Sequence, residues 1–304
     1  MTGIPEVDES TPLAAELAAD ARRKIELVGR KFPKPASTRI ITVANQKGGV
    51  GKTTSTVNLA AALSKGGLRV LVIDNDPQGN ASTALGIDHR SGAASVYEVL
   101  MGDLPISEVV QQAELLPGVE VLGATLDLSG AEIELVSMVA REYRLRRAIE
   151  AYLSYREEQG LEQLDYVLVD CPPSLGLLTL NAFVAGNEVL IPIQCEYYAL
   201  EGLSQLLKTI DMIKQHLNPG LALSAILLTM YDARTNLAGQ VAEEVTSHFP
   251  SETLEVRIPR AVRVSEAPSH GQTVITYDPH SSGALAYLAA AKELAERAET
   301  TEQN

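Results

Sequence analysis

The segment that most limits how this chain can fold is a glycine-rich run, KGGVGKTT, at residues 47–54. The apolar run IITVA precedes it and a helical pattern follows it, which is the strand–loop–helix order of a phosphate-binding loop. Its glycines let backbone N–H groups approach phosphate oxygens, and the positive end of the following helix points at the same place. The pattern puts Lys52 between phosphates as a cation and offers the Thr53 hydroxyl to Mg²⁺. We therefore expect a nucleotide site formed by Lys47, Gly48, Gly49, Val50, Gly51, Lys52, Thr53 and Thr54.

Short runs rich in β-branched residues alternate with helical patterns along the rest of the chain. The predicted strands are Ile40–Ala44, Arg69–Asp74, Val119–Gly123, Tyr166–Asp170, Glu188–Ile193 and Ala222–Met230. The predicted helices are Thr53–Lys65, Glu132–Tyr155, Leu200–Leu217, Leu237–His248 and Ser282–Ala298. Nearly continuous apolar strands separated by helices indicate a parallel sheet covered on both faces. The predicted fold class is α/β, a mostly parallel, doubly wound sheet that carries the phosphate loop.

Residues 1–38 differ from the rest of the chain in their charge pattern. Residues 6–20 hold five acids and no base, whereas residues 21–39 hold seven bases and one acid. An apolar stripe at helical spacing is formed by Leu13, Leu17, Ala21, Ile25, Val28 and Phe32. Pro33 and Pro35 then end it. We predict an N-terminal extension with a short amphipathic helix over residues 1–38, a phosphate-loop (P-loop) domain over 39–299 and a polar tail over 300–304.

Composition excludes several classes of protein. The chain has 304 residues with 39 acids and 25 bases, so its net charge of −14 argues against a protein coated all over in nucleic acid. Two cysteines cannot build a disulfide scaffold or a four-thiolate metal site. The first ten residues lack the basic and apolar regions of a secretory signal, and the longest mostly apolar run, 221–230, is about half a membrane span. A cytoplasmic protein is expected.

Two further apolar runs end in acidic residues. One reads VLVIDNDPQGN from Val70 and the other reads YVLVDCPPS from Tyr166. Parallel strands place such carboxylates at the carboxyl edge of the sheet, where open α/β sheets bind ligands. Asp170 is then expected to hold Mg²⁺, through water. Asp74 has the alternative of bracing its turn, and an acid that ends a strand can also simply cap the next helix.

The loop departs from the common pattern G-x-x-x-x-G-K-[ST], because Gln46 replaces the first glycine and Lys47 adds a second lysine. This resembles the deviant phosphate loop of the ParA/MinD ATPases. The segments ANQKGGVGKTT, DNDPQGNAS, VLVDCPPSLGLLTLNA, LLTMYDARTNL and IPRAVRVSEAPSHG are similar to ParA/Soj partition ATPases over residues 39–295. The resemblance implies a dimer that sandwiches two ATP molecules, in which Lys47 reaches the partner's ATP. It also implies that Asp76 positions the attacking water.

The same resemblance implies where the base binds and which partners the chain has. The base pocket is expected around residues 229–232, with Met230 and Pro259 as contacts, and Ala261 stands where many relatives carry Asn. The implied partners are a second copy of the chain, nonspecific double-stranded DNA of the nucleoid, and a ParB-like centromere-binding protein. The implied cofactors are ATP and Mg²⁺, and hydrolysis is expected to be slow until partners stimulate it.

The sequence itself favours DNA contact through arginines. Arg257, Arg260 and Arg263 recur at steps of three, and Arg234 lies in the segment LLTMYDARTNL. The arginine fork pairs well with phosphate oxygens, and the alternative is that some of these side chains form structural ion pairs. Eight such contacts in a dimer predict a slope of log affinity against log salt of about −7.

Four other functions remain as alternatives. A MinD-like membrane ATPase needs a basic amphipathic C-terminus, but the tail KELAERAETTEQN has two bases and four acids. A metal-cluster carrier needs closely spaced thiolates, which Cys171 and Cys195 are not. A small-molecule ligase has no use for DNA-facing arginines, and an autorepressing ParA needs more than 38 residues for its extra domain. The extension itself is predicted to dock on the core or to be disordered, and the functional alternatives are that it adds DNA contacts or binds a polar scaffold protein.

Overall fold

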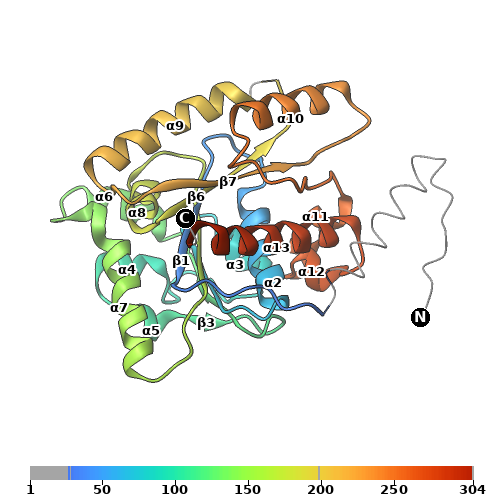
Figure 1. The fold of residues 1–304 in the computed structure, drawn as a ribbon. Coiled ribbons are helices and arrows are strands. Elements are labelled where there is room, and N and C mark those ends of the chain that lie inside the picture. The colour runs from blue at the N-terminus through green and yellow to red at the C-terminus, as the bar shows by residue number, and fades with distance from the viewer. Residues whose placement is uncertain (1–26, 28, 198, 303–304) are drawn as a thin grey trace.

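The computed structural model describes residue 27, residues 29–197 and residues 199–302. Within them, one sheet has the strand order β3-β4-β2-β5-β1-β6-β7, and Figure 1 shows helices on either side of it. The strands are β1 (Arg39–Val43), β2 (Val70–Asp74), β3 (Gln111–Gln112), β4 (Val119–Leu122), β5 (Tyr166–Asp170), β6 (Glu188–Gln194) and β7 (Ala222–Thr229). All neighbours pair in parallel except β3 and β4. The predicted mostly parallel α/β sheet is therefore confirmed.

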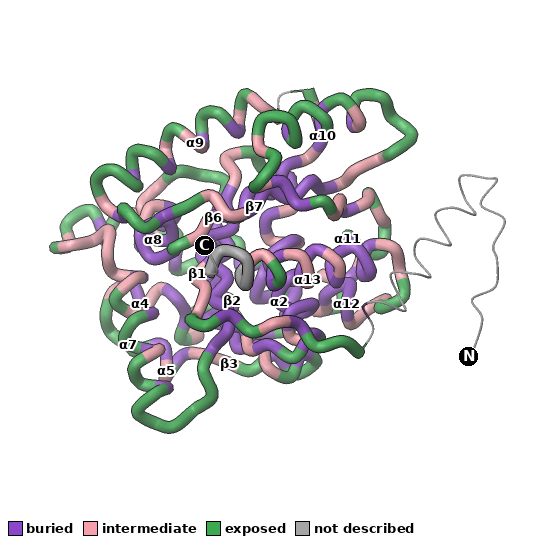
Figure 2. The backbone as a smooth tube through the Cα atoms, viewed as in Figure 1, coloured by how far each residue is buried: buried purple, intermediate pink, exposed green. Residues whose placement is uncertain are grey.

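Helices cover both faces of this sheet. One layer contains α2 (Lys52–Lys65), α3 (Asn80–Ala84), α11 (Val262–Glu266), η2 (Ala267–His270), α12 (Val274–Tyr277) and α13 (Ser282–Glu302). The other contains α4 (Val96–Met101), α5 (Ile106–Val109), α6 (Leu128–Leu135), η1 (Arg141–Tyr143), α7 (Arg144–Glu158), α8 (Leu177–Ala185), α9 (Ala199–His216) and α10 (Asn236–His248). Side chains of β2 alternate between the two layers: Val70 and Val72 pack in the first, Leu71 and Ile73 in the second. Figure 2 accordingly shows buried strands between partly exposed helices.

The strand order places the end of β1 at the centre of the sheet. From β1 the chain crosses to β2 on one side, and it later crosses from β5 to β6 on the other side, so the connections diverge at β1. In the register, Val43 of β1 lies opposite Asp170 of β5, and Asp74 of β2 lies on the other side of Asp170. The phosphate loop and both acidic strand ends therefore meet at one edge, at the point where α/β sheets bind ligands.

The predicted helix Glu132–Tyr155 is wrong as a single element. The structure ends α6 at Leu135 and begins α7 at Arg144. Between them Ala140 adopts a left-handed backbone with φ of 51°, which a continuous right-handed helix cannot contain. The apolar spacing runs through this break because both helices pack on the same face of the sheet.

Part of the predicted N-terminal extension packs on the core. The stripe residues Leu13, Leu17, Ala21, Ile25 and Val28 lie outside the described residues. Leu27 and Phe32 are described, and both are buried in the apolar layer that contains α2. The backbone N–H of Phe32 donates to the carbonyl of Gly66 at 2.9 Å, and a β-carbon on Gly66 would lie 2.2 Å from the Phe32 ring. Phe32 thus fills a site at the end of α2 that only glycine leaves open.

Replacing Phe32 with alanine is expected to lower the free energy of unfolding by about 3 kcal/mol, because it removes a buried aromatic ring from the core. Urea unfolding of the full chain measures this loss. Lys31→Ala is the matched control, since Lys31 is the exposed neighbour. A loss below about 0.5 kcal/mol, the range of ordinary surface changes, would show that this segment is not part of the folded unit.

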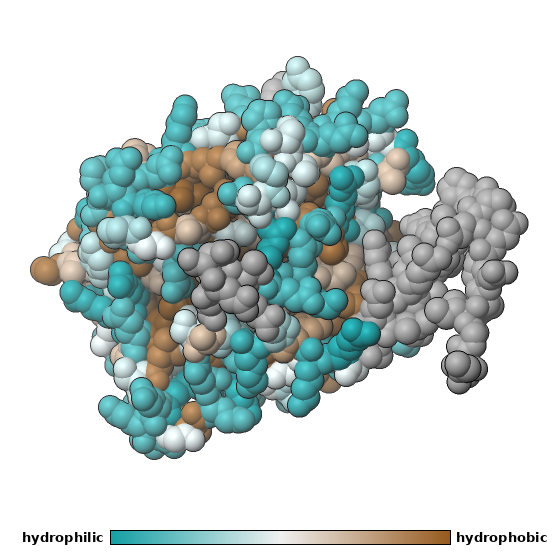
Figure 3. Space-filling view, in the orientation of Figure 1, coloured by the Kyte–Doolittle hydropathy of each residue, from teal (hydrophilic) through white to brown (hydrophobic). Residues whose placement is uncertain are grey.

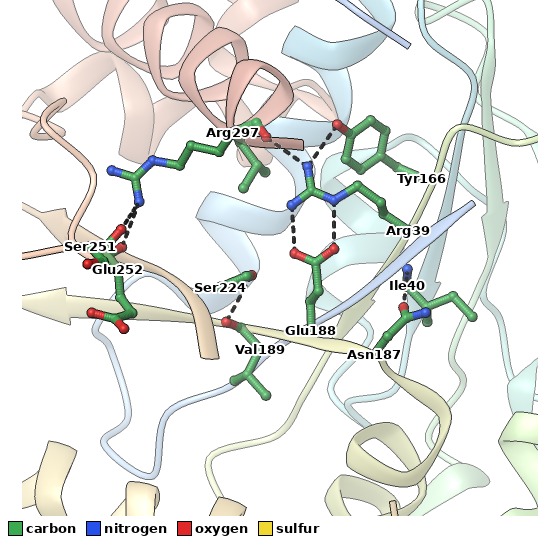
Figure 4. Close-up of polar contacts among 11 residues, drawn as sticks. Arg39, Ile40, Tyr166, Asn187, Glu188, Val189, Ser224, Ser251, Glu252 and Arg297 are labelled. Atoms are coloured by element: carbon green, nitrogen blue, oxygen red, sulfur yellow. Dashed lines mark hydrogen bonds and ion pairs between the residues drawn. The ribbon is translucent and has the colours of Figure 1, made fainter. Parts of the chain in front are cut away.

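The amino edge of the sheet is fastened by a network of charged and polar groups (Figure 4). Arg39 forms two hydrogen bonds of 2.6 Å to Glu188, so that the first residues of β1 and β6 are joined. The same guanidinium donates to the carbonyl of Leu294 in α13 at 2.7 Å and to the Tyr166 hydroxyl at 3.1 Å. One turn later Arg297 donates to carbonyls of the segment after α10. The C-terminal half of α13 is therefore fixed to the amino edge of the sheet, at the opposite end of the strands from the phosphate loop.

The visible surface is mainly polar. Figure 3 shows hydrophilic side chains over most of this face of the molecule, with apolar side chains visible in the recesses between helices. Among the described residues, no helix combines the length and the apolar character needed to cross a bilayer.

Candidate nucleotide-binding site

The phosphate loop is an open backbone cradle at the start of α2. Gly49 and Gly51 have positive φ angles of 75° and 89°, which glycine adopts without strain. A β-carbon on Gly48 or Gly49 would meet nothing within 4 Å, so the loop faces open space. Helix α2 has Gly51 as its N-cap and no side chain that caps its first N–H groups. Free backbone donors at a helix N-terminus are what an anionic phosphate requires.

Lys52 lies inside this cradle. Its side chain is buried, and its Nζ donates to the carbonyl of Lys47 at 3.3 Å. Burial lowers the pKa of Lys52, while the nearby carboxylates of Asp170 and Asp76 act in the opposite direction. A cation held in a partly desolvated loop interacts strongly with any anion that enters it.

Asp170 has the environment of a cation ligand. It is fully buried at the end of β5, and its Oδ1 accepts a hydrogen bond from Thr56 at 3.2 Å. Burial first, and then the charge of Asp74, raise the pKa of Asp170 well above its ordinary value, while hydrogen bonds from Thr53 and Thr56 lower it. Its Oδ2 is buried without a hydrogen-bond partner among the described residues. An unmatched carboxylate oxygen beside a threonine hydroxyl fits Mg²⁺, which takes oxygen ligands.

Phosphate and water oxygens would have to complete that coordination. Within the described ranges, no three His, Cys, Asp or Glu side chains are grouped so that they could hold a metal by themselves. This agrees with the usual use of Mg²⁺ at nucleotide sites, where one or two protein ligands add to phosphates and water.

Asp74, the last residue of β2, and Asp76, in the turn that follows, make different contacts. Asp74 accepts hydrogen bonds from the backbone N–H and the hydroxyl of Ser82, at 2.8 and 2.7 Å, so it braces α3. Asp76 is buried, and among the described residues its Oδ1 accepts a hydrogen bond from the backbone N–H of Gln78 alone, at 3.0 Å. The alternative of bracing the turn therefore describes Asp74. Neither Asp76 nor Asp170 is the N-cap of the helix that follows it, because α3 and α8 have Gly79 and Gly176 as their N-cap residues.

Lys47 extends away from the cradle. Its side chain is 44% exposed, and its Nζ forms an ion pair with Glu196 in the segment after β6. The loop is also tied to β6 by Asn45, whose amide donates to the carbonyl of Pro192 at 2.8 Å. The sequence patterns did not identify Glu196 or Asn45. Both contacts depend on β6 lying beside β1, and only the strand order reveals that neighbourhood.

A small pocket of about 140 Å³ adjoins the cradle. The predicted base contacts Met230 and Pro259 line it, together with Gly51, Thr54, Thr229, Ile258, Arg260, Ala261, Val264, Ser265 and Tyr287. The Thr229 hydroxyl donates to the carbonyl of Val50 at 2.8 Å, which fixes the end of β7 against the phosphate loop. The structure thus brings the two segments with the predicted base contacts to one side of the loop, and Ala261 gives that side a small side chain.

Two of the predicted DNA-binding arginines contact Tyr231, and a third pairs with its neighbour Asp232. Arg257 stacks on the Tyr231 ring at 4.8 Å, and the backbone N–H of Arg260 donates to the Tyr231 carbonyl. Arg234 is also exposed, but it forms two hydrogen bonds of 2.8 Å to Asp232, which lower the pKa of that carboxyl to about 2.

Arg263, three residues after Arg260, lies in α11. It pairs with Glu266 at 3.0 Å and approaches Asp278 at 3.5 Å. The alternative of structural ion pairs therefore describes Arg234 and Arg263, whereas Arg257 and Arg260 have no ion pair among the described residues.

Comparison with known proteins agrees with this geometry. A family model described as an AAA domain matches residues 38–223. The chain is 52% identical over 257 residues to the sporulation initiation inhibitor protein Soj of Bacillus subtilis, covering 84% of this chain and 98% of that protein. It is also 52% identical over 259 residues to the chromosome partitioning protein ParA of Myxococcus xanthus, covering 85% and 88%. The chain belongs to the Soj/ParA family of chromosome-partitioning ATPases.

Solved structures extend the comparison beyond the Soj/ParA family. A cobyrinic acid a,c-diamide synthase from Mycobacterium smegmatis, solved with ADP and magnesium, superposes with a TM-score of 0.70 at 39% identity, covering 84% of this chain and 92% of that one. The cell division ATPase MinD of Pyrococcus furiosus superposes with a TM-score of 0.68 at 27% identity, covering 85% and 99%. The predicted Soj/ParA membership and P-loop fold are thereby confirmed.

Proposed function

We propose that this Soj/ParA protein binds ATP with Mg²⁺, hydrolyses it slowly to ADP and phosphate, and dimerises with two nucleotides between the protomers. One observation carries the proposal: a single loop presents a buried lysine, Lys52, and an exposed one, Lys47. The buried lysine suits the nucleotide of its own chain, and the exposed lysine suits a nucleotide held by a second copy. The magnesium-bound nucleotides in the related Mycobacterium smegmatis structures support the choice of cofactors.

The proposed chemistry relies on positioning and charge. Backbone N–H groups of the loop and Lys52 hold the phosphates, and Thr53 with Asp170 holds Mg²⁺. When bound, the metal neutralises phosphate charge. Asp76, with one oxygen not used in its turn, orients the attacking water and accepts its proton. Because such a site gains most of its rate from exact placement, it turns over slowly until a partner completes it.

The proposed partners follow from the surface and from the family. Arg257 and Arg260 offer phosphate contacts, although the net charge of the chain is −14. Because contacts to phosphates do not depend on the bases, double-stranded DNA would bind this face without sequence preference. A ParB-like centromere-binding protein would stimulate hydrolysis and release the DNA. We therefore place the protein in the cytoplasm, on the nucleoid, with a polar scaffold as a further partner and no membrane.

The ion pairs change the expected salt dependence of DNA binding. If only Arg257 and Arg260 act, a dimer makes about four contacts, and log affinity should fall against log salt with a slope of about −4 instead of −7. Binding of a random-sequence duplex with ATP measures it. Asp232→Asn removes an acidic group beside Arg234 and should steepen the slope, whereas Asp211→Asn on α9 should not. A slope near zero would contradict this DNA surface.

The function itself is tested by ATP turnover with and without DNA and a ParB-like protein. Stimulation by both together that exceeds the sum of each supports partition. Indifference to both favours an alternative: liposome flotation with ATP detects a MinD-like membrane ATPase, and amidation of cobyrinic acid detects an activity like that named for the Mycobacterium smegmatis structure.

A further inference from the structure

Asn75 lies between the two acids of the turn after β2 and is fully buried. Its side-chain N–H donates to the carbonyl of Leu178 in α8 at 2.9 Å, and its backbone N–H donates to the carbonyl of Asp170 at 2.9 Å. Its Oδ1 is buried with no hydrogen-bond partner among the described residues. Asn75 therefore links its own turn, which carries Asp76, to Asp170 and to α8. The oxygen of its side-chain amide has no hydrogen-bond partner among the described residues.

Asn75 ties these segments together on the face of the sheet opposite α2. Neighbouring side chains of an extended chain point to opposite faces, so Asp74 reaches Ser82 of α3, whereas Asn75 reaches α8. Helix α8 in turn holds the loop after β5, because the Thr179 hydroxyl donates to the carbonyl of Ser174 at 2.7 Å. Hydrogen bonds thus connect the segment that follows Asp170, through α8, to the side chain of Asn75, and the next residue along the backbone is Asp76.

Stability does not account for an asparagine at this position. A buried acceptor without a partner destabilises the folded state, and an apolar side chain of similar size would avoid that cost. The Leu178 carbonyl would not be orphaned by the change, since it belongs to a helix that uses it in its own hydrogen-bond ladder. A polar residue kept at the expense of stability is expected where function requires it.

We propose that Asn75 is a positioning residue for ATP turnover, which couples the α8 loop to Asp76 and so sets the orientation of that carboxylate. This inference rests on the proposed ATPase function. Asn75 acts through the backbone of the Asp76 turn, and nucleotide affinity does not depend on it. If the segment between β5 and α8 moves and α8 moves with it, the hydrogen bond from Asn75 to the Leu178 carbonyl shifts Asn75, and the backbone then shifts Asp76.

The test is the variant Asn75→Leu in the full chain. The melting temperature should stay unchanged or rise, and the Kd for Mg-ADP should stay within about twofold, while kcat falls by about tenfold or more, because small misplacement of a reacting group has large effects. In the wild type, Mg-ADP should slow hydrogen exchange in the first turn of α8 and in residues 75–79 together. In the variant, the two segments should respond separately.

Asn218→Leu is the matched control. Asn218 is also buried and donates to the carbonyls of Phe183, Val184 and Gly186 at the far end of α8. Its replacement should lower the melting temperature and leave kcat unchanged. If Asn75→Leu behaves like this control, or if Asn75→Leu and the smaller Asn75→Ala both keep the wild-type kcat, the inference is overturned. If the wild type shows no turnover, the proposed function fails, and the exchange measurement alone decides whether Asn75 couples the two loops.

Discussion

Lys52→Ala is expected to weaken Mg-ATP binding by roughly 10- to 150-fold and to reduce turnover below detection. The variant removes a buried cation, and hydrogen bonds to charged groups contribute about 1.5–3 kcal/mol each. The effect is large because the remaining phosphate donors of the loop are neutral backbone N–H groups, and because the carboxylates of Asp76 and Asp170 then face the phosphates without the lysine between them. Titration of a fluorescent ATP analogue and phosphate release measure both quantities.

The control for this variant lies on the same helix. Lys65→Ala removes an exposed lysine from the last turn of α2 and should leave affinity and turnover unchanged. Wild-type affinity in the Lys52 variant would mean that the loop does not hold the phosphates.

Lys47→Ala should have a different effect. It breaks an exposed ion pair with Glu196, which costs about 0–1 kcal/mol, and it should keep nucleotide binding but lose the ATP-dependent dimer.

Asp76→Asn is expected to lower turnover by about 10²- to 10⁴-fold, the usual contribution of a general base. Asparagine keeps the shape of the side chain and can still accept the hydrogen bond from Gln78, so the turn should survive. The amide cannot accept a proton from water, so ATP should persist and the dimer should accumulate.

Phosphate release combined with size-exclusion chromatography and light scattering measures this split between assembly and turnover. Asp211→Asn, on the exposed side of α9, is the control and should turn over normally. A wild-type rate in the Asp76 variant would remove Asp76 from the mechanism. Loss of the dimer together with turnover would instead mean that the carboxylate is needed to form the assembly.

Much of the fold was predictable because its strands and long helices have strong periodic patterns. The observed β5 has the predicted bounds, and β6 extends by one residue to Gln194. The single helix predicted from Glu132 failed because apolar spacing records which face is buried and not where the backbone turns, so the left-handed Ala140 left no trace in the pattern. The two-residue strand β3 is too short to carry any periodicity.

The site divides in the same way. The phosphate loop and the acidic strand ends were found because local spacing fixes their chemistry, and the parallel sheet brings the two strand ends together. The contact of Lys47 with Glu196 and that of Arg263 with Asp278 join segments far apart in the chain, so local spacing cannot predict them. Arg234 shows the opposite error, because the acid that pairs with it, Asp232, is only two residues away and was already part of the segment.

The hydrogen bonds of Arg39 to Glu188 and Leu294 make the two ends of the sheet differ in how completely their polar groups are paired. Four of the five unmatched buried polar atoms in the described part of the chain belong to Gln46, Asn75, Glu132 and Asp170, all in or beside loops at the opposite end of the strands. The amino ends of the strands are thus joined by paired charges, whereas the end with the phosphate loop keeps buried polar atoms that the described residues do not satisfy. Groups that bind at this end therefore meet polar atoms that the fold itself leaves unpaired.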